Sequence, residues 1–443
     1  MQRAKQIDPR EIIERSAMSP FQWRIVAIMV GLNALDGFDV LSISFASPGI
    51  SSEWGIDRVA LGFVLSMELI GMALGSVLLG RVADRAGRRN TILACLAVMS
   101  AGMFGAATSN SVEMLAGWRI FTGLGIGGML AATNAAVAEV SNGMRRPLTV
   151  IMMAAGYPVG TVVGGTIASL LLSQFDWRSV FVFGGCVSLL FVPIVLRWSP
   201  ESIAFLIHRG RPDSLGRVNA ILAKMGHAPV DGLPQDDPLA GSSARSMAGL
   251  FSPELLRSTL ILTFAYFAHI MTFYFILKWI PKIVADMGYE PALAGSVLVW
   301  ASLGGLAGSV LLGLLTQRAA VRPLTIGAMV LSMGFVVLFG RGAHDLASLS
   351  LLAAIAGFAT NAGVVGLYAL LATSFPTALR ASATGFVIGL GRGGSALAPA
   401  LAGVLFAAGH GLAIVAVLMG MGSIAAAFAL LFLRQRSAPE TTA

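Results

Sequence analysis

Long apolar stretches dominate the chain, and twelve of them are each about 20 residues or longer. Stretches of this length cross a lipid bilayer as helices, because a helix satisfies its own backbone hydrogen bonds. The predicted spans are residues 22–47, 60–80, 90–109, 113–137, 147–172, 178–197, 258–281, 291–315, 322–341, 346–371, 382–406 and 411–433. Glycines recur at a four-residue spacing at Gly71/Gly75, Gly123/Gly127, Gly160/Gly164 and Gly304/Gly308. This spacing predicts close helix packing.

The composition indicates a membrane protein. Of the 443 residues, 56% are hydrophobic and 12% are charged, which is more apolar surface than one soluble core can bury. A net charge of +8 is compatible with a nucleic-acid binder, but the basic residues cluster in short loops between the spans. Cys95 and Cys186 lie in apolar stretches and are expected to be free. The first apolar stretch is too long for a cleavable signal peptide.

The distribution of Lys and Arg predicts the orientation. One set of loops, together with both termini, holds 23 of the 30 basic residues, and the opposite loops hold five, namely Arg58, Arg178, Lys278, Lys282 and Arg341. Basic residues are retained on the cytoplasmic side. We therefore expect a multi-pass protein of the inner (plasma) membrane with both termini in the cytoplasm. The poorly charged loops face outward, and "outer" has this meaning below.

A long polar loop divides the spans six and six. The predicted domains are residues 1–197 and 258–443, joined by a cytoplasmic linker, residues 198–257. The linker opens with an amphipathic helix from Ser202 to Met225, broken near Gly210-Arg211-Pro212. Its remainder has the composition of a flexible tether.

Two acids interrupt the first span. Asp36 and Asp39 lie three residues apart, which puts both carboxyl groups on one face of a helix. Each carboxylate at this depth costs roughly 2.5–3.5 kcal/mol on insertion scales unless it is paired, hydrated or protonated. Such a pair indicates an ion or substrate pathway.

A glycine- and arginine-rich loop joins spans two and three. Its sequence runs Gly80-Arg81-Val82-Ala83-Asp84-Arg85-Ala86-Gly87-Arg88-Arg89. A carboxylate among these cations can face the positive N-terminus of another helix. In the second half the same spacing recurs at Gly313, Gln317, Arg318 and Arg322, with the acid replaced. This weak internal repeat is typical of transporters.

These motifs resemble the major facilitator superfamily over nearly the whole chain. The loop resembles its signature between spans two and three. Further resemblances are Arg119-Ile120-Phe121-Thr122-Gly123 in span four, Gly156-Tyr157-Pro158-Val159-Gly160 in span five, Ser199-Pro200-Glu201-Ser202 after span six, and Phe375-Pro376-Thr377 with Arg380 and Gly391-Arg392-Gly393-Gly394. The element Asp36-Gly37-Phe38-Asp39 narrows the resemblance to aromatic acid:proton symporters. The resemblance implies an all-α fold of two six-helix bundles around a central cavity.

Arg119 is expected beside the acids. At ~1.5 Å per residue, Asp39 lies ~12 Å and Arg119 ~9 Å from the outer ends of their spans, and the resembled fold brings spans one and four together. We predict an ion pair of Arg119 with Asp39 or Asp36. The alternative is that Arg119 only anchors span four.

Arg392 lies near the middle of span eleven, and no acid is obvious in the second-half spans. Its planar guanidinium suits a substrate carboxylate, although bonds to backbone carbonyls are nearly as plausible. His269, in the middle of span seven, is a candidate proton carrier, with a structural hydrogen-bonding role as the alternative. Candidate cavity-lining side chains are Tyr157, Tyr266, Tyr274, Asn361 and Tyr368. Glu68 could assist coupling or pair locally.

A cytoplasmic gate is predicted from charged residues at that end of the spans. It comprises Asp84, Arg85, Arg88, Arg89, Glu139 and Arg380. Glu139 is expected to form a salt bridge with Arg145 or Arg146, which follow it closely in the sequence.

The function predicted is import of a small aromatic carboxylate with protons, by alternating access. The alternatives are a carrier of the same fold for another organic anion, a sugar or a drug, and a membrane sensor or enzyme. The sequence offers no metal-ligand cluster and no nucleophile motif. We therefore expect no enzyme, cofactor, metal or nucleic-acid partner, and a monomer in the lipid bilayer.

Overall fold

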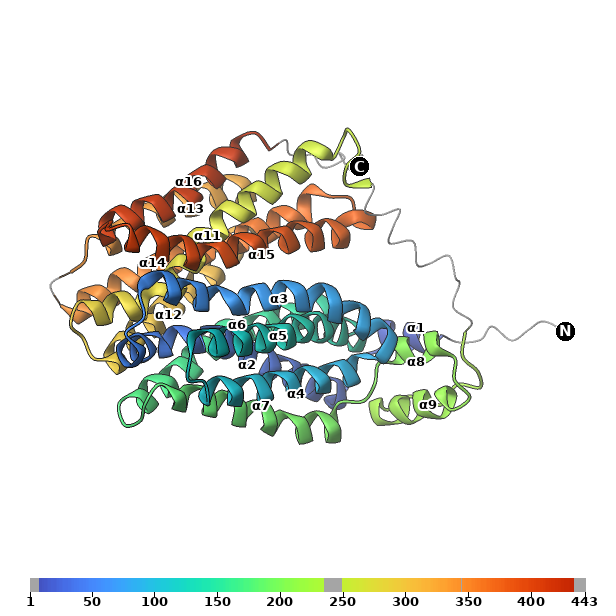
Figure 1. The fold of residues 1–443 in the computed structure, drawn as a ribbon. Helices are drawn as coiled ribbons and strands as arrows, with labels where there is room; N and C mark the ends of the chain where they lie inside the picture. The colour runs from blue at the N-terminus through green and yellow to red at the C-terminus, as the bar shows by residue number, and fades with distance from the viewer. Residues whose placement is uncertain (1–7, 235–248, 344, 434–443) are drawn as a thin grey trace. The chain divides into compact units, whose positions relative to one another are not determined.

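The computed structural model describes residues 8–234, 249–343 and 345–433, and for Arg81, Asp84, Thr377, Ala378 and Ala381 the backbone alone. Within these ranges the chain forms helices and loops, without a β-strand (Figure 1). Twelve helices are long and apolar enough to cross a membrane. They are α2 (Pro20–Trp54), α3 (Arg58–Ala86), α4 (Arg88–Ala107), α5 (Val112–Val140), α6 (Arg146–Leu172), α7 (Arg178–Trp198), α11 (Leu256–Asp286), α12 (Pro291–Leu315), α13 (Val321–Gly340), α14 (Leu346–Ser374), α15 (Thr377–Ala407) and α16 (Leu412–Leu431). The predicted all-α membrane fold and its twelve spans are confirmed.

Three shorter helices flank the spans. The Asp8 side chain caps α1 (Pro9–Arg15), and Ser202 caps α8 (Ile203–Arg209). Gly210 then adopts φ of 56°, a left-handed conformation that ends α8 before α9 (Ser214–Met225). The break predicted at Gly210 is therefore present.

The chain divides into two compact units that do not follow the order of the sequence. The first comprises Met1–Ser42, Ile70–Gly164 and Arg178–Gly241, and the second comprises Ile43–Leu69, Gly165–Trp177 and Ser242–Ala443. The unit boundaries cut α2, α3 and α6, so short outer segments of the first half pack with the second half of the chain. The predicted domain boundaries in the linker stay a prediction.

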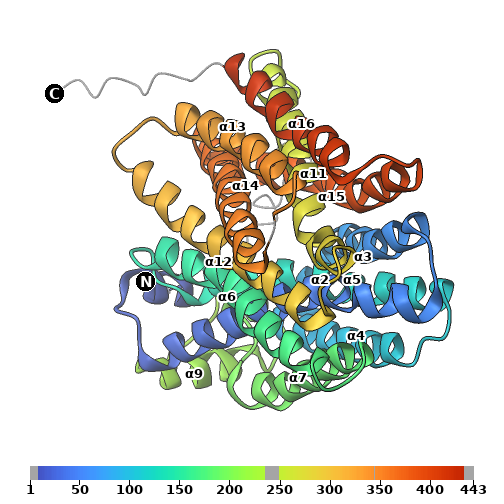
Figure 2. The ribbon, with the colours of Figure 1, turned by 90° about the vertical axis from the view of Figure 1, so that its left-hand side faces the viewer.

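Within each unit the spans pack side by side. In the first unit α4 lies between α5 and α7. In the second unit α11 packs against α14, α15 and α16, and α13 packs against α14 and α16 (Figure 2).

Glycine allows several of these contacts to be very close. A Cβ atom at Gly160 of α6 would lie 1.7 Å from the main-chain oxygen of Ala34 in α2. In the second unit, a Cβ at Gly304 of α12 would lie 1.9 Å from the oxygen of Ala354 in α14. The close packing predicted from the glycine spacing is confirmed at these positions.

One helix end corrects the sequence analysis. The structure continues α11 to Asp286, five residues past the predicted end at residue 281. Lys278 lies inside the predicted span but was counted with the cations of the outer loops, and that assignment was wrong because its side chain is fully buried. The helix continues because charged partners, described below, satisfy the cations of its last turns.

Candidate functional site

The two acids of α2 lie in the interior of the first unit. Asp36 and Asp39 are 2% and 0% exposed, and Arg119 of α5 is 0% exposed. The Arg119 guanidinium donates to the main-chain oxygen of Asp39 at 3.0 Å and to Met103 Sδ at 3.3 Å. It also lies over the Phe181 ring, 5.4 Å from its centroid. Arg119 is therefore beside Asp39, as expected, while an ion pair between the charged groups stays a prediction.

The two acids lie against neighbouring helices of the first unit. A Cβ at Gly184 of α7 would lie 3.1 Å from Asp39 Oδ1, which puts this carboxyl group against α7. Asp36 lies close enough to Cys95 of α4 for its charge to act on the thiol. The expectation that the three-residue spacing places both carboxyl groups on one face is consistent with these contacts.

Close backbone approach fixes α2 next to α6. A Cβ at Gly37, between the two acids, would lie 2.1 Å from the main-chain oxygen of Tyr157. Asn33 donates from Nδ2 to the oxygen of Met153 at 2.7 Å. Tyr157 is half-buried, and it is the predicted cavity-lining residue that belongs to the first unit. Its main chain contacts Gly37, which lies between the two acids.

The other predicted substrate residues belong to the second unit, and three of them form a cluster. The hydroxyl groups of Tyr266 (α11) and Tyr368 (α14) are 3.2 Å apart, and the ring centroids are 6.0 Å apart. The Tyr266 ring packs over Gly391, where a Cβ would lie 2.0 Å from Cδ1. Arg392 of α15 is the next residue in the chain after Gly391. The phenols of Tyr266 and Tyr368 and the segment of α15 that carries Arg392 therefore lie together.

The two remaining predicted substrate residues of this unit are Tyr274 and Asn361. Tyr274 is close enough to Tyr266 to interact with it electrostatically, and it stacks edge-to-face on Phe273 at 5.2 Å. Asn361 of α14 is half-buried, and its amide packs against Gly305 of α12. Tyr368 is 43% exposed, so the cluster is accessible from one side.

His269 is held between helices of the second unit. Its Nε2 lies 2.9 Å from the Thr360 carbonyl oxygen, and its Nδ1 lies 2.9 Å from Ser423 Oγ. Since a carbonyl oxygen only accepts, Nε2 carries a proton. The imidazole is 0% exposed and packs against Gly363. This geometry favours the structural alternative over proton carriage.

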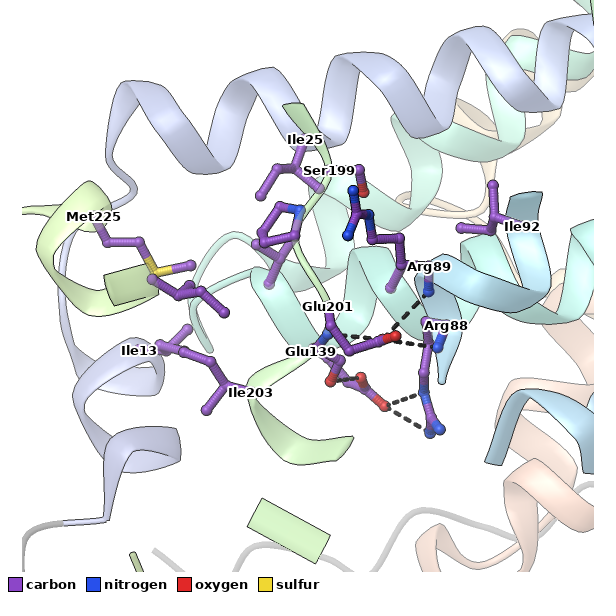
Figure 3. Close-up of a pocket in the computed structure, with 15 residues that line it drawn as sticks. Ile13, Ile25, Arg88, Arg89, Ile92, Glu139, Ser199, Glu201, Ile203 and Met225 are labelled. Carbon is purple, nitrogen blue, oxygen red and sulfur yellow. Dashed lines mark hydrogen bonds and ion pairs between the residues drawn. The ribbon is translucent and has the colours of Figure 1, made fainter. Parts of the chain in front are cut away.

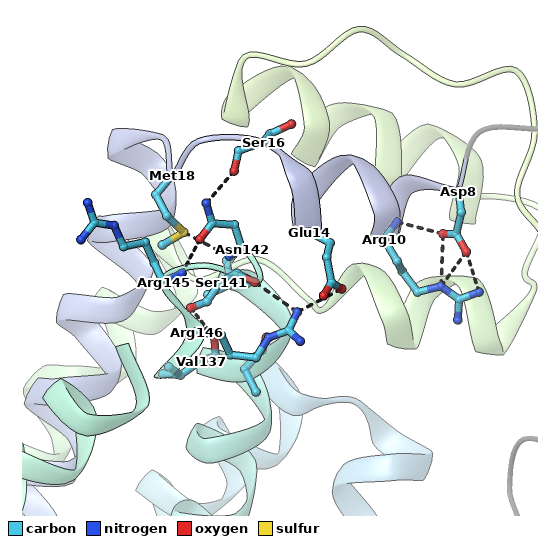
Figure 4. A network of polar contacts seen from close by, with 12 residues as sticks. Asp8, Arg10, Glu14, Ser16, Met18, Val137, Ser141, Asn142, Arg145 and Arg146 are labelled. Atoms are coloured by element: carbon cyan, nitrogen blue, oxygen red, sulfur yellow. Dashed lines mark hydrogen bonds and ion pairs between the residues drawn. The ribbon is translucent and has the colours of Figure 1, made fainter. Parts of the chain in front are cut away.

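The predicted gate contains a salt bridge with a different partner from the one expected. Glu139, at the end of α5, accepts from Arg88 at 2.9 Å and also bonds Ser202 (Figure 3). The expected pairing with Arg145 or Arg146 was wrong in this respect. Arg146 instead bonds Glu14 at 3.4 Å and the oxygen of Ala138 at 2.9 Å (Figure 4), because its guanidinium lies against Glu14 of α1.

Glu201 caps the N-terminus of α4, a role that was not predicted from the sequence. Its carboxylate accepts the backbone N–H groups of Arg88 at 2.8 Å and Arg89 at 3.3 Å, at the N-terminus of α4 (Figure 3). It also accepts from Ser202 N at 3.0 Å. An acid facing a helix N-terminus was expected from Asp84, whose side chain lies outside the described residues. The signal was present in the motif Ser199-Pro200-Glu201-Ser202.

The remaining gate residues are exposed or bond the backbone. Arg89 donates to the oxygen of Leu196 at 2.6 Å, and the Arg85 carbonyl accepts from Arg209 at 2.7 Å. Arg85 and Arg380 are exposed. Arg380 belongs to the second unit and the others to the first.

One buried ion pair was not predicted as such. Glu68 of α3 and Lys278 of α11, both in the second unit, form an ion pair at 3.3 Å with each side chain 0% exposed. Glu68 was expected either to assist coupling or to pair locally, and Lys278 was counted with the cations of the outer loops.

Twelve membrane-crossing helices with buried acids and arginines define a multi-pass membrane transporter of the major facilitator fold. The chain belongs to the Major Facilitator Superfamily, whose sequence pattern matches residues 29–228 and 262–443. The resemblance proposed from the motifs is confirmed, and the relatives are transporters rather than enzymes.

Several similar proteins are named as transporters of aromatic acids. The gallate transporter of Pseudomonas putida is 29% identical over 444 residues, covering 99% of this chain and 98% of that protein. The 4-hydroxybenzoate transporter PcaK of Pseudomonas putida is 29% identical and covers 89% and 88%. Among solved structures, the xylose transporter XylE from E. coli in an inward open conformation has a TM-score of 0.72 at 18% identity, covering 94% and 98%. The last similarity establishes the fold alone.

Proposed function

We propose that the protein is a proton-coupled importer of small aromatic carboxylates that works by alternating access. The observation that carries the proposal is the buried group of Asp36, Asp39 and Arg119, with the guanidinium bonded to the Asp39 backbone at 3.0 Å. Ionisable residues inside membrane spans mark ion or substrate pathways by default. The aromatic acids named for the relatives point to the substrate class.

The coupling step follows from two opposing effects on the acids. Burial away from water favours the neutral carboxyl group, while the neighbouring guanidinium favours the carboxylate. A proton from outside neutralises Asp36 or Asp39 and weakens the attraction to Arg119. Proton occupancy can therefore differ between the two access states, which is what couples proton entry to substrate entry.

The second unit supplies the substrate contacts in this proposal. Arg392 offers two parallel N–H donors to a carboxylate, the geometry of a bidentate pair. Tyr266, Tyr368 and Tyr274 offer aromatic faces and hydroxyl groups for a hydroxylated ring, and Asn361 of α14 offers an amide. On the cytoplasmic side, Arg88, Glu139 and their neighbours form the gate. The excess of basic residues on that side supports cytoplasmic termini in the inner membrane, and we propose a monomer.

The test uses proteoliposomes with an imposed proton gradient, acidic outside, and labelled 4-hydroxybenzoate. Asp39→Asn should abolish accumulation but retain exchange of internal for external substrate. Asp57→Asn, at an exposed helix start where the Asp57 side chain bonds Ala60 N, is the matched control and should accumulate normally. Accumulation by Asp39→Asn that rises normally with the gradient would falsify the coupling role.

A thermal-shift screen separates the rival substrates. Hydroxybenzoates should raise the melting temperature of the purified protein, because a ligand that binds only the folded state stabilises it. Sugars and lipophilic cations should not. Stabilisation by a sugar alone would replace the proposed substrate class, and turnover of substrate without translocation would favour an enzyme.

A further inference from the structure

A fully buried ion pair joins α3 to α11 in the outer part of the second unit. Glu68 Oε2 and Lys278 Nζ lie 3.3 Å apart, with both side chains fully buried. Glu68 lies ten residues from the start of α3 at Arg58, and Lys278 lies eight residues from the end of α11 at Asp286. At ~1.5 Å per residue the pair is roughly 12–15 Å from these ends. Burying both charges carries a large desolvation penalty, which their pairing must offset.

Close contacts surround this pair. Ser66 Oγ accepts from Ala400 N of α15 at 3.1 Å, and Trp279 of α11 donates to the Pro399 oxygen at 3.2 Å. A Cβ at Gly62 would lie 2.6 Å from the same Pro399 oxygen. The outer part of α3 is therefore sealed against α11 and α15, which belong to the other half of the chain.

Holding α3 and α11 together does not by itself explain why an ion pair is buried between them. The same helix ends already carry an exposed salt bridge, Arg58 to Asp286 at 3.1 Å, which Lys282 joins. A buried ion pair is often no more stabilising than apolar residues of the same size. A buried ion pair differs from apolar packing in one property. A single proton on the carboxylate removes the electrostatic attraction between the two side chains.

We propose that Glu68 is a second proton-accepting residue of the transport cycle, and that its pairing with Lys278 holds the outer ends of α3 and α11 together until a proton arrives from outside. The carboxylate takes up one proton and becomes a neutral carboxylic acid, so the pair changes from net charge zero to +1. Lys278 then gains hydration when the helix ends separate. The inference rests on the proposed proton-driven function and adds a site distinct from Asp36 and Asp39.

The neighbouring helices carry other ionisable groups at other positions. Those with described side chains are Arg58 and Arg85 on α3, Arg257, Tyr266, His269, Tyr274, Lys282 and Asp286 on α11, Arg380 and Arg392 on α15, Arg24, Asp36, Asp39 and Glu53 on α2, and Glu113, Arg119 and Glu139 on α5. Glu53 accepts from Trp177 at 2.7 Å, and Arg119 bonds the Asp39 backbone. The part of α15 with close contacts to α3, residues 399–403, contains no ionisable side chain. Lys278 is thus the charged partner that the structure assigns to Glu68.

The experiment measures how fast a buried cysteine at the seam becomes accessible, without any substrate. Ser66→Cys is placed in a background lacking the native thiols (Cys95→Ala and Cys186→Ala). A membrane-impermeant maleimide is applied to intact cells in alkaline or acidic buffer. The rate is divided by that of an exposed outer cysteine, Ser173→Cys, which removes the effect of pH on the reagent. Acid should accelerate the normalised labelling of Ser66→Cys about tenfold, as the closed population falls.

Variants of the pair decide the assignment. Glu68→Gln should label fast in both buffers, and the neutral pair Glu68→Gln/Lys278→Met should lose the acid response while remaining folded, since no buried charge is left unpaired. Asp286→Asn, which removes the exposed bridge, should keep the acid response. An acid response that persists in either Glu68→Gln variant, or that is missing from the parent, overturns the proposal.

A last variant separates this inference from the proposed function. Asp39→Asn should keep the acid response of Ser66→Cys even though accumulation is lost. If the protein moves no aromatic acid but the acid response depends on Glu68, the proposed substrate is wrong and the proton site stands. If Asp39→Asn removes the acid response, the labelling reports Asp39 and the assignment to Glu68 fails.

Discussion

Arg119 donates a hydrogen bond to the main-chain oxygen of Asp39, which ties the cation to the backbone of the helix that carries both buried acids. A backbone carbonyl accepts whatever the protonation state of the neighbouring carboxyl groups. The guanidinium therefore keeps its place when a proton arrives, and only its electrostatic interaction with the acids changes. A fixed cation beside acids of variable charge is the arrangement that a proton-coupled step requires.

Replacing Arg119 should separate its charge from its geometry. Arg119→Lys retains the charge but cannot bond both Asp39 O and Met103 Sδ, so we expect proton-driven uptake to fall at least ~10-fold. Arg119→Ala should abolish uptake and lower the free energy of unfolding by about 1–3 kcal/mol, because a buried acceptor loses its donor. Uptake rates and detergent melting curves measure both effects. Arg24→Lys, at an exposed position of α2, should change neither, and full uptake by Arg119→Lys would show that charge alone suffices.

Arg392 should govern affinity for the carboxylate. Arg392→Gln is expected to raise KM for 4-hydroxybenzoate at least ~10-fold, which corresponds to about 1.4 kcal/mol. Arg392→Lys should recover part of the affinity, since a single charge replaces the bidentate fork. Concentration dependence of substrate exchange gives KM without the proton gradient. Arg341→Gln, an exposed arginine, is the control, and an unchanged KM in Arg392→Gln would move the carboxylate site elsewhere.

His269 should matter for stability rather than for coupling. His269→Ala removes the imidazole from Thr360 O and Ser423 Oγ, of which Ser423 keeps its bond to Ser332 Oγ, and this should cost about 1–3 kcal/mol of unfolding free energy. The transporter that remains folded should still accumulate substrate with the proton gradient. Melting curves and accumulation per folded molecule test this, with exposed His410→Ala as the control. A variant such as His269→Gln that melts normally but exchanges substrate without accumulating it would restore the proton-carrier role.

The sequence predicts spans well and the partners of charges less well. Twelve apolar stretches are visible directly in the sequence, because each helix that crosses a bilayer needs ~20 predominantly apolar residues. The proximity of Arg119 to Asp39 was predicted because the two residues lie at similar depths in their spans and because the major facilitator fold brings spans one and four together. Glu139 was assigned to arginines near it in sequence, but its partner Arg88 is 51 residues away.

Buried ion pairs are the features that are hardest to predict from local sequence patterns. Lys278 follows an apolar run and precedes Pro281, which suggests the end of a span. In the structure the helix continues, because Glu68 satisfies Lys278 and Asp286 satisfies Lys282. Polar residues near a span end therefore do not mark its end when a neighbouring helix supplies the opposite charge. Only the tertiary structure identifies that neighbour.

The contact between α2 and α6 should be intolerant of a single methyl group. A Cβ at Gly160 would lie 1.7 Å from the oxygen of Ala34, and backbone atoms cannot move aside as a side chain can. Gly160→Ala should therefore destabilise the protein by about 1–3 kcal/mol and displace α2, which carries Asp36 and Asp39, so uptake should fall with stability.

The matched control for this substitution is Gly117→Ala in α5, where no atom lies within 4 Å of the added Cβ. There the lower helix propensity of glycine is the dominant effect, and alanine should be neutral or stabilise by up to about 1 kcal/mol. Melting temperatures of the two variants in the same detergent measure the difference. Equal melting temperatures would mean that α2 and α6 are not held at backbone contact, and the rigid placement of the acids beside Arg119 would lose its support.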